Sequence, residues 1–427
     1  MPRPPGADAN LDAWLRYLEQ LHPAAIDLGL DRVARVRDRL DLAPRFPIIT
    51  VGGTNGKGST CALLEAFLHS AGYRVGVYTS PHLLRYNERV RIGGAAIADD
   101  ALVDAFTRIE QSRGAVSLTY FEFGTLAAVL LFIEAQVDVA VLEVGLGGRL
   151  DAVNVFEPDC AVVTSIGMDH MDYLGHTREE IGFEKAGIFR ADTPAVVAEL
   201  DPPARLLDHA RAIGADVYLI DRDFGYTSTE SQWQFWDWLG KRSGLPLPAL
   251  RGEYQLANAA AALAALDTIR PRLPVEMGAI RRGLVEVELP GRFQVLAGRP
   301  AVILDVAHNP HAAQRLAENL RRMDRRGRRI AVFAMLKDKD LEGVIEAIMD
   351  EIDEWLIAPL TAVRGADVAR LQQALQRAGV DRPVAVCADI SQAIRRAREH
   401  AQPDDKILVF GSFYTVADAL RTLAGTP

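Results

Sequence analysis

The chain has 427 residues, too many for one ordinary hydrophobic core, so we expect two domains. Its composition is 49% hydrophobic and 25% charged, which is typical of a globular protein. The net charge of −9 argues against a broad nucleic-acid-binding surface, because such a surface requires a basic face. An anionic substrate is compatible with this charge if local positive groups hold it.

The cysteines and the apolar runs indicate neither a metal finger nor a membrane span. Cys61, Cys160 and Cys387 lie far apart without metal-ligand spacing, so we expect reduced thiols in the core of a cytoplasmic protein. Residues 1–10 are proline-rich and lack the apolar run of a signal peptide. No apolar segment has the length of a membrane span, so a membrane is not an expected partner. Nucleic acid is not an expected partner either, because the net charge is negative.

Strand and helix patterns alternate through the first part of the chain. Short apolar runs predict the strands of this series, at 48–51, 74–78, 138–144 and 160–165. A helix is predicted at 58–71, and strands that alternate with helices indicate a parallel sheet covered on both faces. Polar and aromatic residues alternate over 227–238, which predicts a local antiparallel hairpin, and 254–269 predicts an alanine-rich helix.

A second alternating series follows a turn-prone joint at Pro290 and Gly291. Its predicted strands, each followed by a helical pattern, are 301–306, 329–333, 354–358, 383–387 and 406–410. We therefore expect an α/β protein with a P-loop ATPase domain and a mainly parallel sheet over 1–290. A hinge over 291–299 and a smaller Rossmann-like domain over 300–427 are expected to follow. Ligands of such sheets bind outside the carboxyl ends of the strands.

The sharpest motif is a glycine-rich loop that follows a strand and opens a helix, Gly53-Thr54-Asn55-Gly56-Lys57-Gly58-Ser59. Glycines let backbone N–H groups approach phosphate oxygens, and the helix N-terminus and Lys57 add positive charge. A hydroxyl from Ser59 or Thr60 can reach magnesium. The usual pattern has a glycine where Val51 stands and a hydroxyl directly after the lysine, so this loop is a variant. The alternative is a glycine-rich turn without a ligand.

A carboxylate and several polar residues follow the neighbouring predicted strands. Glu143 ends its strand, where it can face the phosphate loop and hold magnesium, or be an ordinary exposed acid. His170 offers a neutral imidazole to a metal with Asp169 as its partner, although a lone histidine is more often structural. Ser80 could line the same cleft or belong to a plain proline turn. Lys185 lies on a short predicted helix, where a solvated lysine is the ordinary interpretation.

In the second series, Asp305 and His308 lie at the end of a predicted strand. Both could contact the nucleotide or the phosphoryl group that is transferred. The alternative is a plain helix start, with Asn309 as the cap and Pro310 in the first turn. On spacing alone the two interpretations have about equal weight.

Taken together, these motifs resemble the bacterial bifunctional dihydrofolate synthase/folylpolyglutamate synthases of the Mur ligase superfamily. The resemblance runs over nearly the whole chain, and its most specific elements are the variant loop and the segments 79–83, 142–151, 165–170, 184–188, 290–293 and 305–311. The shifted glycine in the loop is this family's own form. The segment 252–258 departs from the pattern but keeps Gln255 and Asn258, which could equally be ordinary polar groups at a helix start.

The resemblance implies a role for each matching residue. The implied ATP contacts are Thr54, Asn55, Gly56, Lys57, Gly58, Ser59, Asn258, Arg292 and Asp305. Two magnesium ions are implied, with Ser80, Glu143 and His170 as ligands, and Lys185 is implied to be carboxylated on its amine. The implied pterin-binding residues are Asp27, Leu28, Gly29, Leu30, Phe121, Glu122, Phe123, Gly124, Leu150, Asp151 and Ala152. Lys57, Glu143, His170, Lys185, Arg292 and His308 are the implied catalytic group.

The implied activity is an ATP-dependent ligation of L-glutamate to dihydropteroate and to reduced folates by a monomeric enzyme. A substrate carboxylate would attack the γ-phosphate, and the amine of glutamate would then attack the acyl phosphate, releasing ADP and phosphate. A monofunctional folylpolyglutamate synthase and a peptidoglycan Mur ligase are the rivals within the enzyme class. A nucleotide-binding switch protein is the rival outside it, but the sequence lacks an Asn-Lys-x-Asp guanine-reading motif.

Overall fold

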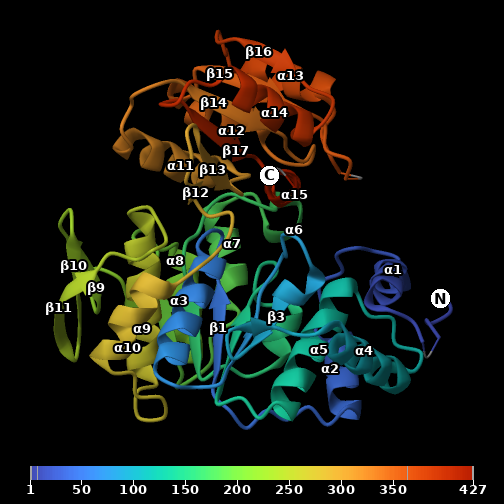
Figure 1. Cartoon of the computed structure of the whole chain (residues 1–427). Helices are drawn as coiled ribbons and strands as arrows, with labels where there is room; N and C mark the ends of the chain where they lie inside the picture. Colours follow the sequence, from blue (N-terminus) through green and yellow to red (C-terminus); the bar gives the residue numbers. More distant parts are fainter. Residues whose placement is uncertain (1, 7, 363, 426–427) are drawn as a thin grey trace. The chain divides into compact units, whose positions relative to one another are not determined.

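The computed structural model describes residues 2–6, 8–362 and 364–425. The chain divides into two compact units, each containing a mainly parallel sheet with helices on both faces (Figure 1). The first unit runs to Ala249 and resumes with Leu256–Val287. The second unit comprises Leu250–Gln255 and the chain from Glu288 onward. Both sheets confirm the α/β class predicted from the alternating patterns.

In the first unit, the described strands form a sheet of order β4-β3-β2-β5-β1-β6-β7-β8. The strands from β2 to β8 in that order run parallel, whereas β3 and β4 form an antiparallel edge. Their bounds are β1 (Ile48–Gly52), β2 (Val75–Tyr78), β3 (Val90–Ile92), β4 (Ala95–Ala96), β5 (Val139–Glu143), β6 (Cys160–Val163), β7 (Pro194–Val197) and β8 (Asp216–Leu219). Every residue of β1, β2, β5 and β6 is buried, because helices cover both faces.

Helices of the first unit bury apolar stripes against the two faces of this sheet. One core joins alternate strand residues such as Ala140 and Leu142 to α1 (Leu11–Leu21), α2 (Asp31–Arg39), α4 (Asp99–Arg113) and α5 (Tyr120–Glu134). On β1, β2 and β5 lies α3 (Lys57–Ser70), which also packs against α10 (Met277–Glu286). The remaining helices of this unit are α6 (Met171–Leu174), α7 (Arg178–Ala186), α8 (Ala204–Ile213), α9 (Tyr254–Thr268, which begins in the second unit) and the 3-10 helices η1 (Tyr86–Arg89) and η2 (Ala152–Val155).

A small antiparallel sheet consists of β9 (Gly225–Ser228), β10 (Gln232–Asp237) and β11 (Gly240–Pro246). The sequence predicted only the hairpin of the first two strands. The third strand, Gly-Lys-Arg-Ser-Gly-Leu-Pro, has two glycines and buries only Leu245, so it lacks a strand-like apolar pattern. Trp233 and Phe235 of β10 supply the buried face.

In the second unit, the described sheet has the order β12-β13-β17-β14-β15-β16, with only β12 antiparallel. Its strands are β12 (Gln294–Leu296), β13 (Ala301–Asp305), β14 (Arg329–Phe333), β15 (Glu354–Ile357), β16 (Val384–Val386) and β17 (Lys406–Phe410). Its helices are α11 (Pro310–Arg322), α12 (Leu341–Ile348), η3 (Met349–Glu351), α13 (Val368–Arg377), α14 (Ile390–His400) and α15 (Phe413–Ala424). One core unites α11, α12 and α13, while α14 and α15 pack together and contact β14, β15 and β17.

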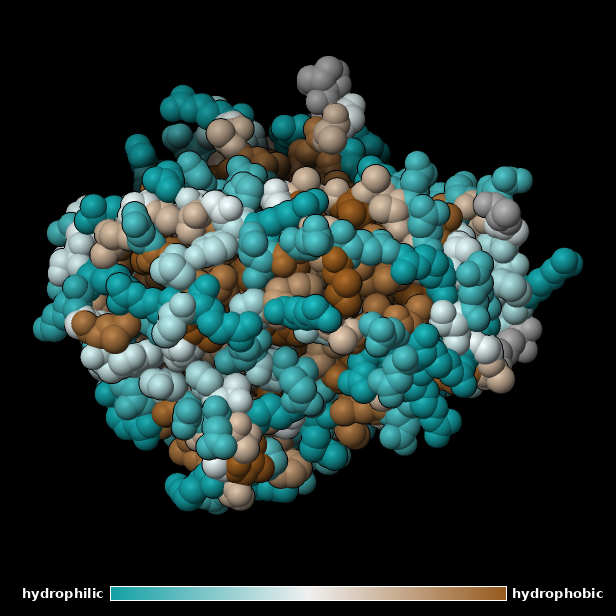
Figure 2. All heavy atoms as spheres, turned by 90° about the horizontal axis from the view of Figure 1, so that it is seen from below, coloured by the Kyte–Doolittle hydropathy of each residue, from teal (hydrophilic) through white to brown (hydrophobic). Residues whose placement is uncertain are grey.

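The cysteines, the surface and the helix lengths can be compared with what the sequence predicted. Cys61, Cys160 and Cys387 are free and buried, as predicted. Hydrophilic side chains cover most of the face in Figure 2, and apolar atoms show between them. Among the helices that the structure describes, none is both long and apolar enough to cross a membrane.

Candidate active site

The phosphate loop connects β1 to α3 and needs glycine at two positions. Gly53 and Gly56 have φ angles of 142° and 89°, which residues with a side chain rarely adopt. A β-carbon at Gly53 would lie 2.0 Å from Thr164 Oγ1, and one at Gly56 would lie 2.5 Å from Asn258 Oδ1. The predicted loop residue Gly56 and the predicted ATP contact Asn258 are therefore neighbours.

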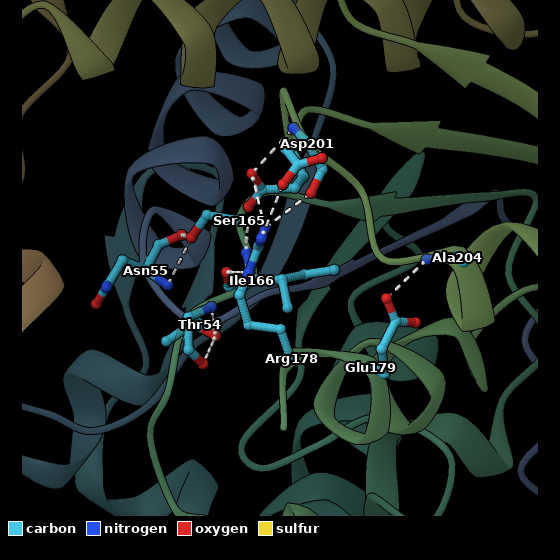
Figure 3. Close-up of polar contacts among 10 residues, drawn as sticks. Thr54, Asn55, Ser165, Ile166, Arg178, Glu179, Asp201 and Ala204 are labelled. Carbon is cyan, nitrogen blue, oxygen red and sulfur yellow. Dashed lines mark hydrogen bonds and ion pairs between the residues drawn. The ribbon is translucent and has the colours of Figure 1, made fainter. Parts of the chain in front are cut away.

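Hydrogen bonds fasten the loop to the segment that follows β6 (Figure 3). The Thr54 N–H donates to Ser165 O at 2.7 Å, and the Asn55 N–H donates to Ser165 Oγ at 3.0 Å. Thr164 Oγ1 donates to Asn55 O at 2.7 Å, and the Gly167 N–H donates to Thr54 Oγ1 at 3.0 Å. These hydrogen bonds therefore fix the loop relative to a segment that lies over a hundred residues later in the sequence.

Lys57 and the first turn of α3 complete the loop. The Lys57 ammonium group donates to Gly53 O at 3.1 Å and to Thr54 O at 3.2 Å, so it lies over the loop. Ser59 and Thr60 are buried in the first turn, and Thr60 Oγ1 has no hydrogen-bond partner among the described residues. The loop presents a cation and helix N–H groups on one side, which suits an anionic phosphate.

Glu143 lies at the end of β5, where its backbone is in register with Val51 of β1. Its side chain is buried, at 5% exposure, and Glu143 Oε2 accepts the Ser80 N–H at 3.0 Å. The structure therefore brings together two of the three predicted metal ligands. Within the described ranges, no three His, Cys, Asp or Glu side chains form a metal-binding cluster. This donor set fits a hard cation such as magnesium, which takes few protein ligands and completes its shell with water and phosphate oxygens.

His170 caps the N-terminus of the short helix α6 in a left-handed conformation, with φ 52°. Asp169 Oδ1 accepts the His170 N–H at 2.9 Å and lies 3.9 Å from His170 Nε2. The hydrogen bond between the two residues comes from the backbone of His170 and not from its imidazole, so the role of Asp169 as partner of the imidazole stays a prediction. The histidine side chain is about one-third exposed, so its imidazole is accessible.

Lys185 is buried at 3% exposure near the end of α7, which rules out the solvated lysine considered from sequence. Burial of the ammonium group, with the charge of Lys57 as a second cause, lowers the pKa of Lys185 to about 7. Asp169 and Asp151 act in the opposite direction. The pKa of Lys185 therefore depends on charges in the phosphate loop, in the His170 segment and in the glycine-rich segment after β5.

The segments predicted to bind pterin meet through backbone and charge contacts. The Gly29 N–H donates to Leu150 O at 3.2 Å. Asp151 is buried, and its oxygens accept the Leu146 N–H at 2.8 Å and the Val153 N–H at 3.1 Å. Burial nevertheless raises the pKa of Asp151 to about 7.

Arg32 forms ion pairs with two of the predicted pterin-binding residues, Asp27 and Glu122. The sequence did not predict a role for Arg32. Its guanidinium group lies 2.8 Å from Asp27 Oδ2 and 3.2 Å from Glu122 Oε1. The imidazole of His22 holds Asp27 from the other side, with Nε2 3.0 Å from Asp27 Oδ2. Glu122 also closes the N-terminal cap of α5 by accepting the Thr119 N–H at 2.7 Å.

The other predicted acceptor residues have mixed surroundings. Phe121 packs where a side chain at Gly145 would collide with its ring, whereas Phe123 is fully buried against Phe106. The hydroxyl groups of Tyr78 and Tyr86 crowd Gly124. The remaining predicted residues lie in the same two loops: Leu28 and Leu30 before α2, and Ala152 at the start of η2.

In the second unit, the Phe413 ring lies near two predicted functional residues, Arg292 and His308. The Arg292 guanidinium carbon is 4.9 Å from the centre of the Phe413 ring, and the His308 ring centre is 6.2 Å from it. Asp305 is buried and accepts the Phe293 and Ala307 N–H groups, each at 2.8 Å. Asn309 caps α11 by accepting the Ala312 N–H, so the helix-start interpretation is confirmed.

Comparisons with known proteins show the family to which the chain is similar. The Mur ligase middle domain matches residues 51–266, and the Mur ligase glutamate ligase domain matches residues 291–413. A curated relative, dihydrofolate synthase/folylpolyglutamate synthase of Escherichia coli (strain K12), is 46% identical over 99% of this chain and 97% of its own length.

Two similar solved structures were determined with ligands. Escherichia coli FolC in complex with DHPP and ADP has a TM-score of 0.94 and 46% identity over 98% of this chain and 99% of its own. A bifunctional folylpolyglutamate synthase/dihydrofolate synthase with Mn, AMPPNP and L-glutamate has a TM-score of 0.92 and 47% identity. That comparison covers 99% of this chain and 100% of the other.

Proposed function

Because the chain belongs to the Mur ligase family, we propose that it is an ATP-dependent ligase that adds L-glutamate to dihydropteroate and to reduced folates. The observation that carries the proposal is the meeting of charges around the buried Lys185. Lys57 of the phosphate loop lowers the pKa of Lys185, and Asp151 of the predicted pterin-binding segment raises it. We propose that the loop binds phosphate and that the Asp151 segment binds the acceptor, so that one buried lysine serves the transfer of a phosphoryl group between them.

ATP and magnesium are the proposed cofactors, with two ions bound. The relatives' structures contain ADP, AMPPNP and manganese, which supports a nucleotide and a divalent cation here. Glu143, Ser80 and His170 would hold the metal, which when bound neutralises phosphate charge. The ATP contacts are proposed to be the loop from Thr54 to Ser59 with Asn258, Arg292 and Asp305.

The chain's own residues act mainly by positioning and by charge. The acceptor carboxylate oxygen forms a bond to the γ-phosphorus of ATP as the bond to ADP breaks. Lys57 and Arg292 balance the negative charge of the transferring group. The amine of L-glutamate then attacks the acyl carbon, an amide forms, and phosphate leaves. No protein nucleophile takes part, so none of the side chains needs to form a covalent intermediate.

An acceptor screen tests this proposal. ADP release is measured with dihydropteroate, tetrahydrofolate and a UDP-muramyl acceptor, each with and without L-glutamate. Glutamate-dependent release with the first two acceptors is expected. Release with tetrahydrofolate alone would leave a monofunctional folylpolyglutamate synthase, and release with the muramyl acceptor alone would refute the folate assignment. Light scattering of the purified protein tests the further expectation that it is a monomer.

A further inference from the structure

The backbone N–H and C=O of Ile166 are each held by one member of an oppositely charged pair, Glu199 and Arg178. Figure 3 shows Arg178 beside Ile166. Glu199 Oε2 accepts the Ile166 N–H at 2.6 Å, and Arg178 Nε donates to Ile166 O at 3.3 Å. Glu199 follows β7, and Arg178 is the first residue of α7. Two elements that lie later in the chain therefore fix the two consecutive peptide groups that flank the Ile166 α-carbon, in the segment that follows β6.

The two charged side chains also hold each other. Arg178 Nη2 lies 3.4 Å from Glu199 Oε1, and Arg178 donates to Asp201 O at 2.7 Å and to Asp201 Oδ2 at 3.0 Å. The Glu199 side chain is mostly buried, whereas that of Arg178 is about two-fifths exposed. An ion pair with one exposed member contributes little to stability, so the geometry that it enforces is its more informative property.

The residues on each side of Ile166 are those that hold the phosphate loop. Ser165 accepts the Thr54 and Asn55 N–H groups, and the Gly167 N–H donates to Thr54 Oγ1. The Ile166 N–H shares a peptide group with Ser165 O, and Ile166 O shares the next one with the Gly167 N–H. A shift of either peptide group would therefore displace a contact to the loop.

We propose that Glu199 and Arg178 are positioning residues that hold the phosphate loop in its nucleotide-binding shape by fixing the two peptide groups that flank the Ile166 α-carbon. The inference rests on the proposed function in that the loop binds the phosphates of a nucleotide. Among the described residues, neither side chain has a hydrogen bond or an ion pair to the loop itself. A loop ordered before binding does not lose that conformational freedom when the nucleotide binds, so the pair raises nucleotide affinity.

The test compares the ADP affinity of the full chain, measured by calorimetry with magnesium present, for the wild type and for Glu199→Ala, Glu199→Gln, Arg178→Met and Asp208→Asn. We expect Glu199→Ala to weaken ADP binding about tenfold, or roughly 1.4 kcal/mol. Glu199→Gln should weaken it less, because the amide oxygen can still accept the Ile166 N–H. Asp208 forms an exposed ion pair with Arg211 on α8, so Asp208→Asn is the control and should bind ADP normally.

The KM values separate positioning from a general structural defect. The KM for ATP should rise with the ADP dissociation constant, while the KM for L-glutamate stays unchanged. Normal ADP affinity in folded Glu199→Ala and Arg178→Met would overturn the inference, as would equal rises in all KM values together with early unfolding. If Glu199→Ala fails to fold, an unchanged ADP affinity in Glu199→Gln and Arg178→Met would overturn it as well. Absence of ADP binding by the wild type would instead contradict the proposed function.

Discussion

The guanidinium group of Arg32 lies 3.2 Å from the carboxylate of Glu122, a buried group ninety residues later in the chain. The same guanidinium pairs with Asp27 at 2.8 Å, so one side chain fastens the first predicted acceptor segment to the start of α5. Without this cation, Glu122 would keep a buried charge with no opposite charge beside it, which is costly.

Replacing Arg32 by methionine should raise the KM for dihydropteroate about tenfold, because a displacement of the acceptor residues by an ångström has costs of at least this order. ADP affinity should not change. Steady-state kinetics with varied acceptor would measure the effect, and Arg35→Met, an exposed arginine on the same helix, is the matched control. Adding Glu122→Gln should recover stability, because the buried charge is then gone. A normal KM in Arg32→Met would show that the acceptor does not use this segment.

Gly53→Ala should abolish most nucleotide binding. The new β-carbon would lie 2.0 Å from Thr164 Oγ1, so the loop must move away from the segment after β6. Gly72→Ala is the control, because Gly72 also has a positive φ, 95°, but open space around it. Backbone strain should cost each variant about 1–3 kcal/mol in urea unfolding. ADP titration should separate them, and tight ADP binding by Gly53→Ala would count against the loop assignment.

Lys185 should react with carbon dioxide, since its pKa is lowered to about 7. Only the neutral amine adds carbon dioxide, so the reactive fraction grows as the pH rises through 7. Activity of enzyme depleted of bicarbonate should therefore recover on adding bicarbonate at pH 8, and recover much less at pH 6. Lys185→Ala should fold but lose most activity, and Lys185→Arg should not restore it if a negative carbamate is required. Native mass spectra that show only unmodified lysine in bicarbonate would refute this.

Arg292→Ala should lower kcat on the order of a hundredfold, as removal of one positioned charge donor does in other enzymes. Its guanidinium group lies over the Phe413 ring, so Phe413→Leu should give a smaller loss by freeing that group. Arg315→Ala, on the exposed surface of α11, serves as the control. Turnover close to normal in a folded Arg292→Ala protein would exclude the proposed contact with ATP.

Local patterns predicted most of the fold and the position of the glycine-rich loop between β1 and α3. The loop was found because its glycines, lysine and hydroxyl are contiguous, and β1 and β14 were found because short apolar runs report burial. The contacts of Arg32 and Glu199 were not predicted, because their partners are 90 and 33 residues away and an isolated charged residue resembles any surface charge. The strand β11 was missed because its pairing with β10, rather than its own composition, makes it a strand.

The position of β1 in its sheet has a consequence for synthesis of the chain. Its neighbours are β5 and β6, so the strand Ile48–Gly52 leaves the ribosome long before Val139–Val163 can cover its edges. At roughly 5–20 residues per second the delay is several seconds or more. Protease digestion of stalled nascent chains, cut before and after β6, would show when this strand becomes protected. Until then the phosphate loop cannot take its final shape, and a strand that is fully buried in the folded protein stays exposed to aggregation.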